Sequence, residues 1–312
     1  MIITVTMNPA IDKTIETERF FYGALNRIAP PLTDAGGKGI NVSKTIKAMG
    51  GKSIATGFLG KEGSETILSC LQKEGIENDF VFVDGVTRTN LKIMEKDGTL
   101  TEINEEGMTV SGEKIEELLK KLESYAAQDV WFVLAGSIPK GVDKNIYAHI
   151  TEKLKAKGAK VFVDADGELF AKAVKAVPDM LKPNHIELAE YFGLKEEPTE
   201  EQLITFGKKL LAEGVESIAV SRGSHGALFL HAGENKVIRC DAMQVEVHST
   251  VGAGDAMVAA LVFAKDTNMS WEEGITLAMA ASNGAVTTMG TKTPEKSVIT
   301  ALQKQVKQVV LE

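Results

Sequence analysis

Asp255 stands in a glycine turn before an apolar helical pattern, in the stretch STVGAGDAMVAA at 249–260. Gly252 and Gly254 flank Ala253, and free N–H groups at the start of a helix, together with the helix dipole, attract an anion. The acid at this position is compatible with phosphoryl transfer, in which the turn holds the phosphoryl group and the carboxylate accepts the proton of the attacking hydroxyl. The alternative is that Asp255 only stabilises the start of the helix.

Three other glycine motifs do not fit this chain. The dinucleotide fingerprint G-x-G-x-x-G fails at Met257, where the third glycine would stand, and too few residues follow for a complete binding domain. The phosphate loop suggested by GKS at 51–53 requires a glycine at Ile46. The serine-hydrolase elbow suggested by RGSHG has Arg222 in place of its first glycine.

A second glycine cluster, DAGGKGINVS at 34–43, precedes another helical pattern. Glycines allow the backbone to approach a ligand closely. Lys38 and Asn41 add a cation and an amide to the same turn. The pattern indicates a ligand-binding turn, with a flexible strand-to-helix connection as the alternative.

Asn184 and Glu187 stand three residues apart at the start of a helical pattern, in KPNHIELAE at 182–190. Their oxygens face the same side and can hold a hydrated Mg²⁺ ion. The alternative is a capping Asn184 with an unrelated Glu187 in the first turn.

Short β-branched runs alternate with helical patterns along the chain, which predicts a mostly parallel sheet with helices on both faces. The expected strands are 2–6, 53–60, 80–84, 129–135, 160–165, 180–184, 217–223, 226–230 and 236–240. The expected helices are 38–49, 62–74, one from Ser111, 144–157, and three that begin near Gly254, Trp271 and Ser297.

Residues 13–33 and 87–104 depart from this alternation and are predicted to be exposed antiparallel strands, with KDGT at 96–99 as a hairpin turn. We expect a single domain, 1–312, with a small β lid formed by about 12–33 and 86–106.

The composition excludes several classes of partner. The 312 residues carry a net charge of -8, which argues against nucleic acid or an anionic membrane surface. The two cysteines, Cys70 and Cys240, form no spaced cluster, and the apolar stretches are too short to cross a bilayer. We predict a cytoplasmic protein.

Taken in order, the three stretches resemble the ribokinase-like, or PfkB-type, carbohydrate kinases. The resemblance rests on GGKGIN at 36–41, NHIE at 184–187 as a version of the N-x-x-E motif, and TVGAGDAMVAA at 250–260. VTMNPAIDKTI at 5–15 resembles the branch that contains 1-phosphofructokinase and tagatose-6-phosphate kinase. The resemblance implies a three-layer, doubly wound fold and a lid that covers the sugar and pairs two subunits in a homodimer. It also implies ATP with Mg²⁺ as the phosphoryl donor.

The resemblance also implies site roles. Asp255 is the expected base, and Gly252, Ala253 and Gly254 form the anion hole. The residues expected to bind the sugar phosphate are Asp12, Gly37, Lys38, Asn41, Arg88, Asn90, Lys92 and Ser137, with Arg27 contributed across a dimer. The residues expected to bind ATP are Asn184, Ser221, Gly223, Ser224, Gly226, Gly254 and Asn283, and Glu187 and Asn184 hold Mg²⁺ through water.

The predicted reaction is the ATP-dependent phosphorylation of fructose 1-phosphate to fructose 1,6-bisphosphate. Tagatose 6-phosphate and fructose 6-phosphate remain alternative substrates, because one sequence does not rank their geometries. A non-catalytic regulator that binds a sugar phosphate and a nicotinamide oxidoreductase are the alternatives from other classes.

Overall fold

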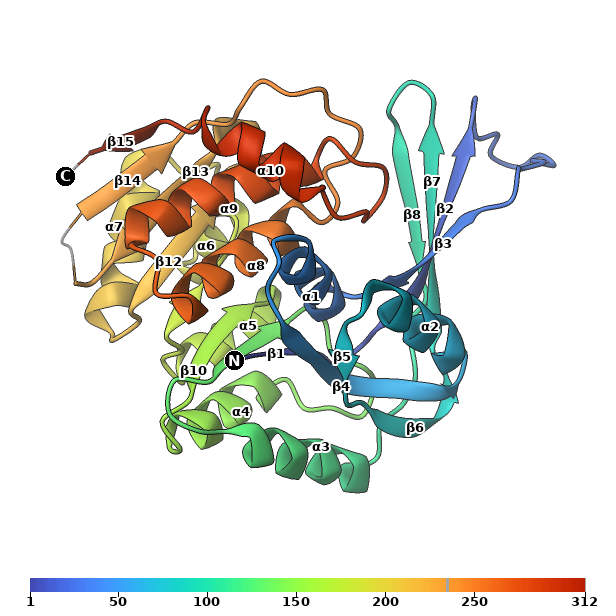
Figure 1. Cartoon of the computed structure of the whole chain (residues 1–312), viewed down its shortest axis with the longest axis horizontal. Helices are drawn as coiled ribbons and strands as arrows, with labels where there is room; N and C mark the ends of the chain where they lie inside the picture. The colour runs from blue at the N-terminus through green and yellow to red at the C-terminus, as the bar shows by residue number, and fades with distance from the viewer. Residues whose placement is uncertain (234–235, 312) are drawn as a thin grey trace.

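The computed structural model describes residues 1–233 and 236–311, and its strands form two sheets (Figure 1). The large sheet has the order β15-β14-β13-β12-β11-β10-β9-β1-β4-β5, and β6 pairs with β4. All neighbours from β12 to β5 pair in parallel, and β13, β14 and β15 continue the sheet in antiparallel pairing. The bounds are β1 (Ile2–Thr6), β4 (Ser53–Glu62), β5 (Glu77–Asn78), β6 (Val81–Val86), β9 (Trp131–Ala135), β10 (Lys160–Asp164), β11 (Met180–Leu181), β12 (Ser217–Ser221), β13 (Ala227–His231), β14 (Lys236–Cys240) and β15 (Gln308–Val310).

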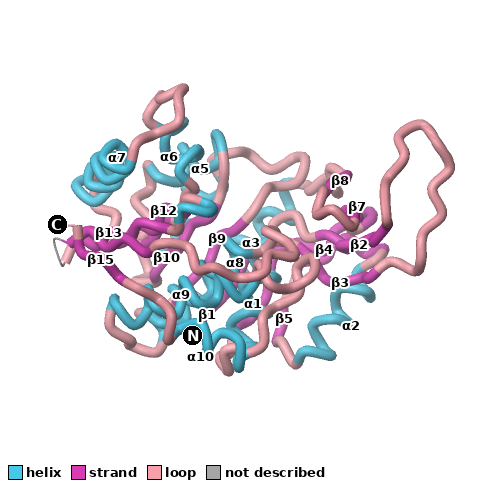
Figure 2. Tube along the Cα trace, turned by 90° about the horizontal axis from the view of Figure 1, so that it is seen from above, coloured by secondary structure: helices cyan, strands magenta, loops and turns pink. Residues whose placement is uncertain are grey.

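Helices cover both faces of the large sheet, which confirms the predicted three-layer fold (Figure 2). One hydrophobic cluster joins the sheet to α3 (Gly112–Tyr125), α4 (Ile146–Lys155), α5 (Gly167–Val174), α6 (His185–Tyr191) and α7 (Glu200–Ala212). The opposite cluster involves α1 (Lys38–Ala48), α8 (Ala253–Asp266), α9 (Trp271–Ala285) and α10 (Lys296–Gln303). Helix α2 (Ser64–Glu74) packs with α1 and β4 in a third cluster, and η1 (Gly223–His225) is a single 3₁₀ turn.

Local sequence explains the helix that begins after Ser111. The Ser111 hydroxyl accepts a hydrogen bond from the Lys114 N–H at 3.4 Å, so it is the predicted N-cap. Leu118, Leu119 and Leu122 are buried at helical spacing against the sheet. Helix α8 is apolar on almost every side because it lies between α1, α9 and the sheet.

Some elements differ from the predicted ranges. Helix α2 starts at Ser64 and not at 62, because Lys61 and Glu62 still belong to β4. Helices α5 and α7 and strand β15 lie outside the predicted alternation.

The small sheet has the order β3-β2-β7-β8 and projects from one end of the molecule (Figure 1). Its strands are β2 (Ala10–Thr17), β3 (Leu32–Gly36), β7 (Arg88–Glu95) and β8 (Leu100–Asn104). The pairs β2–β3 and β7–β8 are antiparallel, as predicted, but the central pair β2–β7 is parallel. The reason is that β2 follows β1 and β7 follows β6. Strands β1 and β6 both pair in parallel with β4, so the chain leaves the same edge of the large sheet in the same direction both times.

Residues 18–31 form a loop and not the predicted strand, and this loop extends away from the small sheet (Figure 2). Pro30 and Pro31 lack the N–H groups that strand pairing needs. The Asn26 side-chain oxygen accepts a hydrogen bond from the Phe21 N–H, and its nitrogen donates to the Phe21 carbonyl, both at 2.9 Å. The predicted turn at 96–99 is confirmed, because the Gly98 N–H donates to the Glu95 carbonyl at 2.9 Å.

The connections between the two sheets are short. Residues 7–9 alone join β1 to β2, Gly37 alone joins β3 to α1, and Thr87 alone joins β6 to β7. Thr87 is buried, and its N–H donates to the Glu62 carbonyl at 2.8 Å. Two of these connections follow the carboxyl ends of β1 and β6, and the third leads from β3 into α1, so the small sheet is attached at the carboxyl edge of the large sheet.

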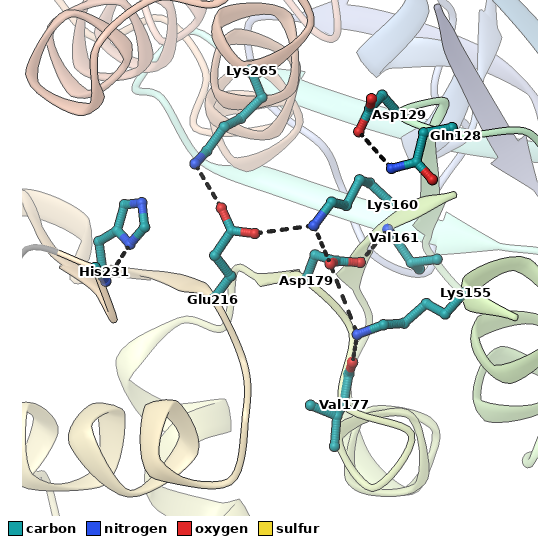
Figure 3. A network of polar contacts seen from close by, with 11 residues as sticks. Gln128, Asp129, Lys155, Lys160, Val161, Val177, Asp179, Glu216, His231 and Lys265 are labelled. Atoms are coloured by element: carbon teal, nitrogen blue, oxygen red, sulfur yellow. Dashed lines mark hydrogen bonds and ion pairs between the residues drawn. The ribbon is translucent and has the colours of Figure 1, made fainter. Parts of the chain in front are cut away.

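The amino edge of the large sheet carries a network of ion pairs (Figure 3). Lys160 Nζ lies 3.1 Å from Asp179 Oδ1 and 3.4 Å from Glu216 Oε2, and Lys265 Nζ lies 3.0 Å from Glu216 Oε1. Lys155 donates to the Val177 carbonyl beside them. The charges on this edge are thus paired with one another.

No helix in residues 1–233 and 236–311 has the length and hydropathy that crossing a membrane requires.

Candidate active site

A cavity of about 480 Å³ lies at the carboxyl ends of the parallel strands, between the large and small sheets. The strand ends contribute Thr6 of β1 and Asn8 after it, Ala135 of β9 with Gly136 and Ser137 after it, Asp164 of β10, Lys182 and Asn184 after β11, and Ser221 of β12. Ligands of open parallel sheets bind at this edge. The cavity is therefore the candidate active site.

Asp255 lies in this cavity in the first turn of α8 and is 6% exposed. Its Oδ2 accepts a hydrogen bond of 2.8 Å from the Asn41 amide. Burial raises the pKa of Asp255 to about 6, although the nearby Lys38 ammonium opposes this. Gly252, the N-cap residue, has φ 84°, in the left-handed region that glycine adopts without a Cβ penalty. The carboxylate is thus ionised near neutral pH and poised to accept a proton.

Two lysines share a buried carboxylate beside Asp255. Asp164 is 1% exposed, and its Oδ1 lies 3.4 Å from Lys38 Nζ and 3.3 Å from Lys182 Nζ. Burial disfavours the charge on Asp164, yet Lys182 and Lys38 hold its pKa below the ordinary value. A Cβ atom on Gly254 would lie 3.2 Å from Lys182 Nζ. The Lys182 ammonium is therefore next to the glycine turn that begins α8.

The second glycine cluster places α1 against the small sheet. A Cβ atom on Gly36 would lie 2.4 Å from the Asp12 carboxyl carbon. Gly37 has φ 113°, and a Cβ there would lie 2.6 Å from Thr6 Cγ2. These two glycines let the strand turn directly into the helix, which brings Lys38 and Asn41 to the cavity wall.

The small sheet contributes a polar set to the cavity. The Lys92 ammonium donates to Asp12 Oδ2 at 2.6 Å, and the Asn90 amide donates to Asp12 Oδ1 at 3.1 Å. Arg88 donates to the Asn8 carbonyl at 2.9 Å and to the Glu105 carbonyl at 3.1 Å. The positive charge of Lys92 is thus balanced within the chain by Asp12.

Asn184 and Glu187 both line the cavity and form a capping box at the start of α6. The Glu187 N–H donates to Asn184 Oδ1 and the Asn184 N–H donates to Glu187 Oε2, both at 2.8 Å. Burial raises the pKa of Glu187. Asn184 and Glu187 therefore cap the helix and line the cavity at the same time, and Glu187 is part of the cap.

The remaining predicted site residues lie outside the cavity lining. Ala253 is the first residue of α8, between two lining glycines. Gly223, Ser224 and Gly226 continue from Ser221, which does line it. Arg27 lies exposed on the 18–31 loop. Asn283 is buried in α9, where its amide accepts from the Met243 N–H at 3.0 Å and donates to the Met279 carbonyl at 2.8 Å.

The cavity lining is rich in polar atoms without partners. Ten buried side-chain nitrogen or oxygen atoms of the described residues lack a hydrogen-bond partner, and six belong to lining residues. These six are in Thr6, Asn8, Asn41, Arg88, Asn90 and Asp164. Buried polar groups are normally satisfied. Their concentration here indicates a polar ligand.

Several lining residues were not predicted from the sequence: Thr6, Asn8, Glu102, Asn104, Asp164, Asp166, Lys182 and Thr291. Asp164 and Lys182 are the most important of them, since both are charged groups that act on Asp255 together with Lys38. Each is a charged residue at the end of a short apolar strand, and that pattern is the signal that could have identified them.

The three layers, the small sheet and an acid in a glycine turn define a sugar kinase of the ribokinase type. The chain belongs to the pfkB family of carbohydrate kinases, whose sequence pattern matches residues 5–297. This confirms the predicted class of enzyme, a phosphotransferase that acts on a sugar.

The chain is 36% identical to the 1-phosphofructokinase of Bacillus subtilis, over 98% of this chain and 99% of that protein. It is 32% identical to the D-tagatose-1-phosphate kinase of Bacillus licheniformis, over 98% and 99% of the two chains. Phosphofructokinase-2 from Escherichia coli, solved in complex with substrates and products, is similar with a TM-score of 0.92 at 25% identity, over 97% of this chain and 98% of that one.

Proposed function

We propose that this protein transfers the γ-phosphoryl group of ATP to fructose 1-phosphate and forms fructose 1,6-bisphosphate and ADP. The observation that carries the proposal is the buried Asp255 carboxylate beside two lysines at the start of α8. The similarity to 1-phosphofructokinases over nearly the whole chain supports the choice of sugar.

In this mechanism Asp255 accepts the proton of the C6 hydroxyl as its oxygen forms a bond with the γ-phosphorus. The bond from that phosphorus to the oxygen bridging it to the β-phosphorus breaks, and ADP leaves with the electron pair. The Asn41 amide, 2.8 Å from Asp255 Oδ2, orients the carboxylate toward the hydroxyl. A general base of this kind contributes on the order of 10²–10⁴ in rate.

The charge that develops on the phosphoryl group is stabilised by the N–H groups of the glycine turn and by Lys182. A phosphate loop normally contains its own lysine. In this chain Gly252, Ala253 and Gly254 are followed by the acid, and the cation comes from the end of β11. Lys38, whose pKa is raised chiefly by Asp164, supplies a second fixed positive charge.

Mg²⁺ would supply further charge neutralisation when bound with the nucleotide phosphates. Hard oxygen donors suit this ion. Glu187 and Asn184 at the cavity wall, and the partnerless Oδ2 of the buried Asp164, provide such donors. We infer contacts through water, because Asn184 Oδ1 and Glu187 Oε2 are already engaged in the capping box. Ser221 and the adjoining 223–226 loop lie on the nucleotide side, and Asn283 borders the adenine.

The sugar end of the cavity is formed by Asp12, Gly37, Asn41, Asn90 and Ser137. The chain works as one unit, with the small sheet as its lid. Lys92 and Arg88 already have acceptors within the chain, so the phosphate of the substrate gains from a further cation. We infer that Arg27 of a second subunit supplies it in a homodimer joined through the small sheets. The exposed apolar residues Tyr22 and Leu25, 97% and 74% exposed, support that interface.

Three further substrates compete with fructose 1-phosphate. Tagatose 6-phosphate remains from the sequence, and the similarity to a D-tagatose-1-phosphate kinase adds tagatose 1-phosphate. Fructose 6-phosphate is the third, and like tagatose 6-phosphate it remains from the sequence. A non-catalytic regulator is disfavoured by the intact base and glycine turn. The location in the cytoplasm and the absence of a nucleic-acid partner stay predictions.

A panel of phosphosugars with ATP tests the proposal, because specificity is a ratio of kcat/KM values. Fructose 1-phosphate is expected to give the highest kcat/KM among fructose 1-phosphate, fructose 6-phosphate, tagatose 1-phosphate and tagatose 6-phosphate. A higher value for another sugar would reassign the substrate. No ATP turnover with any of them would favour the regulator.

A further inference from the structure

Arg222 lies directly after Ser221 of the cavity wall, at the start of the loop that ends at Gly226. Its side chain is 12% exposed. Its Nη1 atom donates to Glu200, and its Nη2 atom donates to the His225 carbonyl at 2.7 Å. The Arg222 side chain thus spans its own loop and connects it to α7.

Backbone hydrogen bonds also close the same loop. The Arg222 N–H donates to the Gly226 carbonyl at 2.8 Å, and the His225 N–H donates to the Arg222 carbonyl at 3.0 Å. Gly226 has φ 79°, and a Cβ there would lie 2.0 Å from the Cys240 carbonyl oxygen. The loop therefore lies close against the end of β14 and is closed by two backbone hydrogen bonds.

Glu200 is well placed to hold Arg222. It is the first residue of α7, next to a capping box in which Thr199 accepts from the Gln202 N–H. One carboxylate oxygen of Glu200 accepts from Arg222, and the other lies 3.4 Å from Arg239 on β14. The planar guanidinium of arginine can serve two acceptors at fixed angles, which a lysine ammonium does not reproduce.

We propose that Glu200 and Arg222 are positioning residues that hold the Ser221–Gly226 loop in the shape that binds ATP. This inference rests on the proposed function. The pair lies on the nucleotide side, and none of its contacts reaches Asp12, Asn90 or Lys92 at the sugar end. Loss of the pair weakens the binding of ATP and leaves the binding of the sugar phosphate unchanged.

The test uses the full-length Glu200→Gln and Arg222→Lys variants, with Arg239→Gln as the matched control. Arg239 also contacts Glu200 but makes no hydrogen bond or ion pair with the loop in the part of the chain that the structure describes. Titration calorimetry with a non-hydrolysable ATP analogue and, separately, with fructose 1-phosphate gives the two Kd values. The two variants are expected to raise the Kd of the analogue on the order of tenfold, with the sugar Kd and the control unchanged.

Unchanged Kd values for the analogue in both variants would overturn the inference, and so would a parallel loss of both affinities together with a lowered Tm. Arg222→Lys keeps the charge, so it reports on the loop even if Glu200→Gln unfolds. Failure of the wild-type protein to bind the analogue would instead contradict the proposed function.

Discussion

The Oδ2 atom of Asp255 lies 2.8 Å from the side-chain nitrogen of Asn41, so an amide of α1 orients the acid at the start of α8. The two helices begin at the two glycine clusters of the sequence. The proposed base and the turn proposed to bind the sugar are therefore in direct contact, although they are far apart in the chain.

Replacing Asp255 with Asn is expected to lower kcat by a factor on the order of 10² or more, because the attacking hydroxyl loses its proton acceptor. The affinity for ATP is expected to stay close to that of the wild type. Asp266→Asn, at the opposite end of α8, is the matched control and should keep full turnover. Turnover near the wild-type level in Asp255→Asn would exclude this residue as the base.

The rate is expected to depend on pH through Asp255. Its pKa is raised to about 6, mainly by burial, so the carboxylate is ionised and active above this value and protonated below it. The value of kcat/KM should fall about tenfold per pH unit well below pH 6. The residual rate of Asp255→Asn serves as the control, and an identical acidic limb in its profile would assign the titration to the substrate phosphate.

The same burial makes Asp255 unfavourable for stability. Between the ordinary pKa and the raised one, the folded protein binds more protons than the unfolded chain, so wild-type stability falls as the pH rises through this window. At pH 8 the free energy of unfolding of Asp255→Asn is expected to exceed that of the wild type by on the order of 3 kcal/mol. Urea denaturation at pH 4 and pH 8 measures this, and a variant without any gain at pH 8 would count against it.

Gly252 and Gly98 form a matched pair for testing the glycine turn. Both have positive φ, 84° and 89°, and a Cβ on either would meet no heavy atom within 4 Å. Alanine at each position is expected to cost about 1 kcal/mol of stability through the backbone conformation. Only Gly252→Ala adds a methyl group to the cavity, so it alone should lower kcat, by on the order of tenfold. Equal turnover of the two variants would argue against an anion hole at Gly252.

The homodimer is tested at Leu25, which is 74% exposed on the 18–31 loop. Leu25→Glu places a charge in the proposed interface and is expected to convert dimers into monomers in sedimentation experiments. Met269→Glu, at an exposed apolar residue after α8, is the control. A monomeric wild-type protein at micromolar concentration would refute the dimer, and with it the role of Arg27.

The sequence predicted the parts of the site that carry their own local signature. Gly252, Gly254 and Asp255 form such a signature, because glycines before an apolar helical run indicate a helix start that can hold an anion. Asp164 and Lys182 do not, since each is one charged residue at a strand end, and only the parallel order β10–β11 brings them together. Local sequence also does not indicate which strand from another part of the chain a given strand pairs with. The parallel pair β2–β7 was therefore found only in the structure.

The single-residue joints at Gly37 and Thr87 have a mechanical consequence. Asp12 belongs to the small sheet, while Lys38 starts α1 immediately after Gly37. We expect a tilt of the small sheet to move the first turn of α1 as well, where the Asn41 amide donates to Asp255. Closure of the small sheet over a sugar would then also reach the carboxylate that we propose as the base, because one short connection joins the two ends of the cavity.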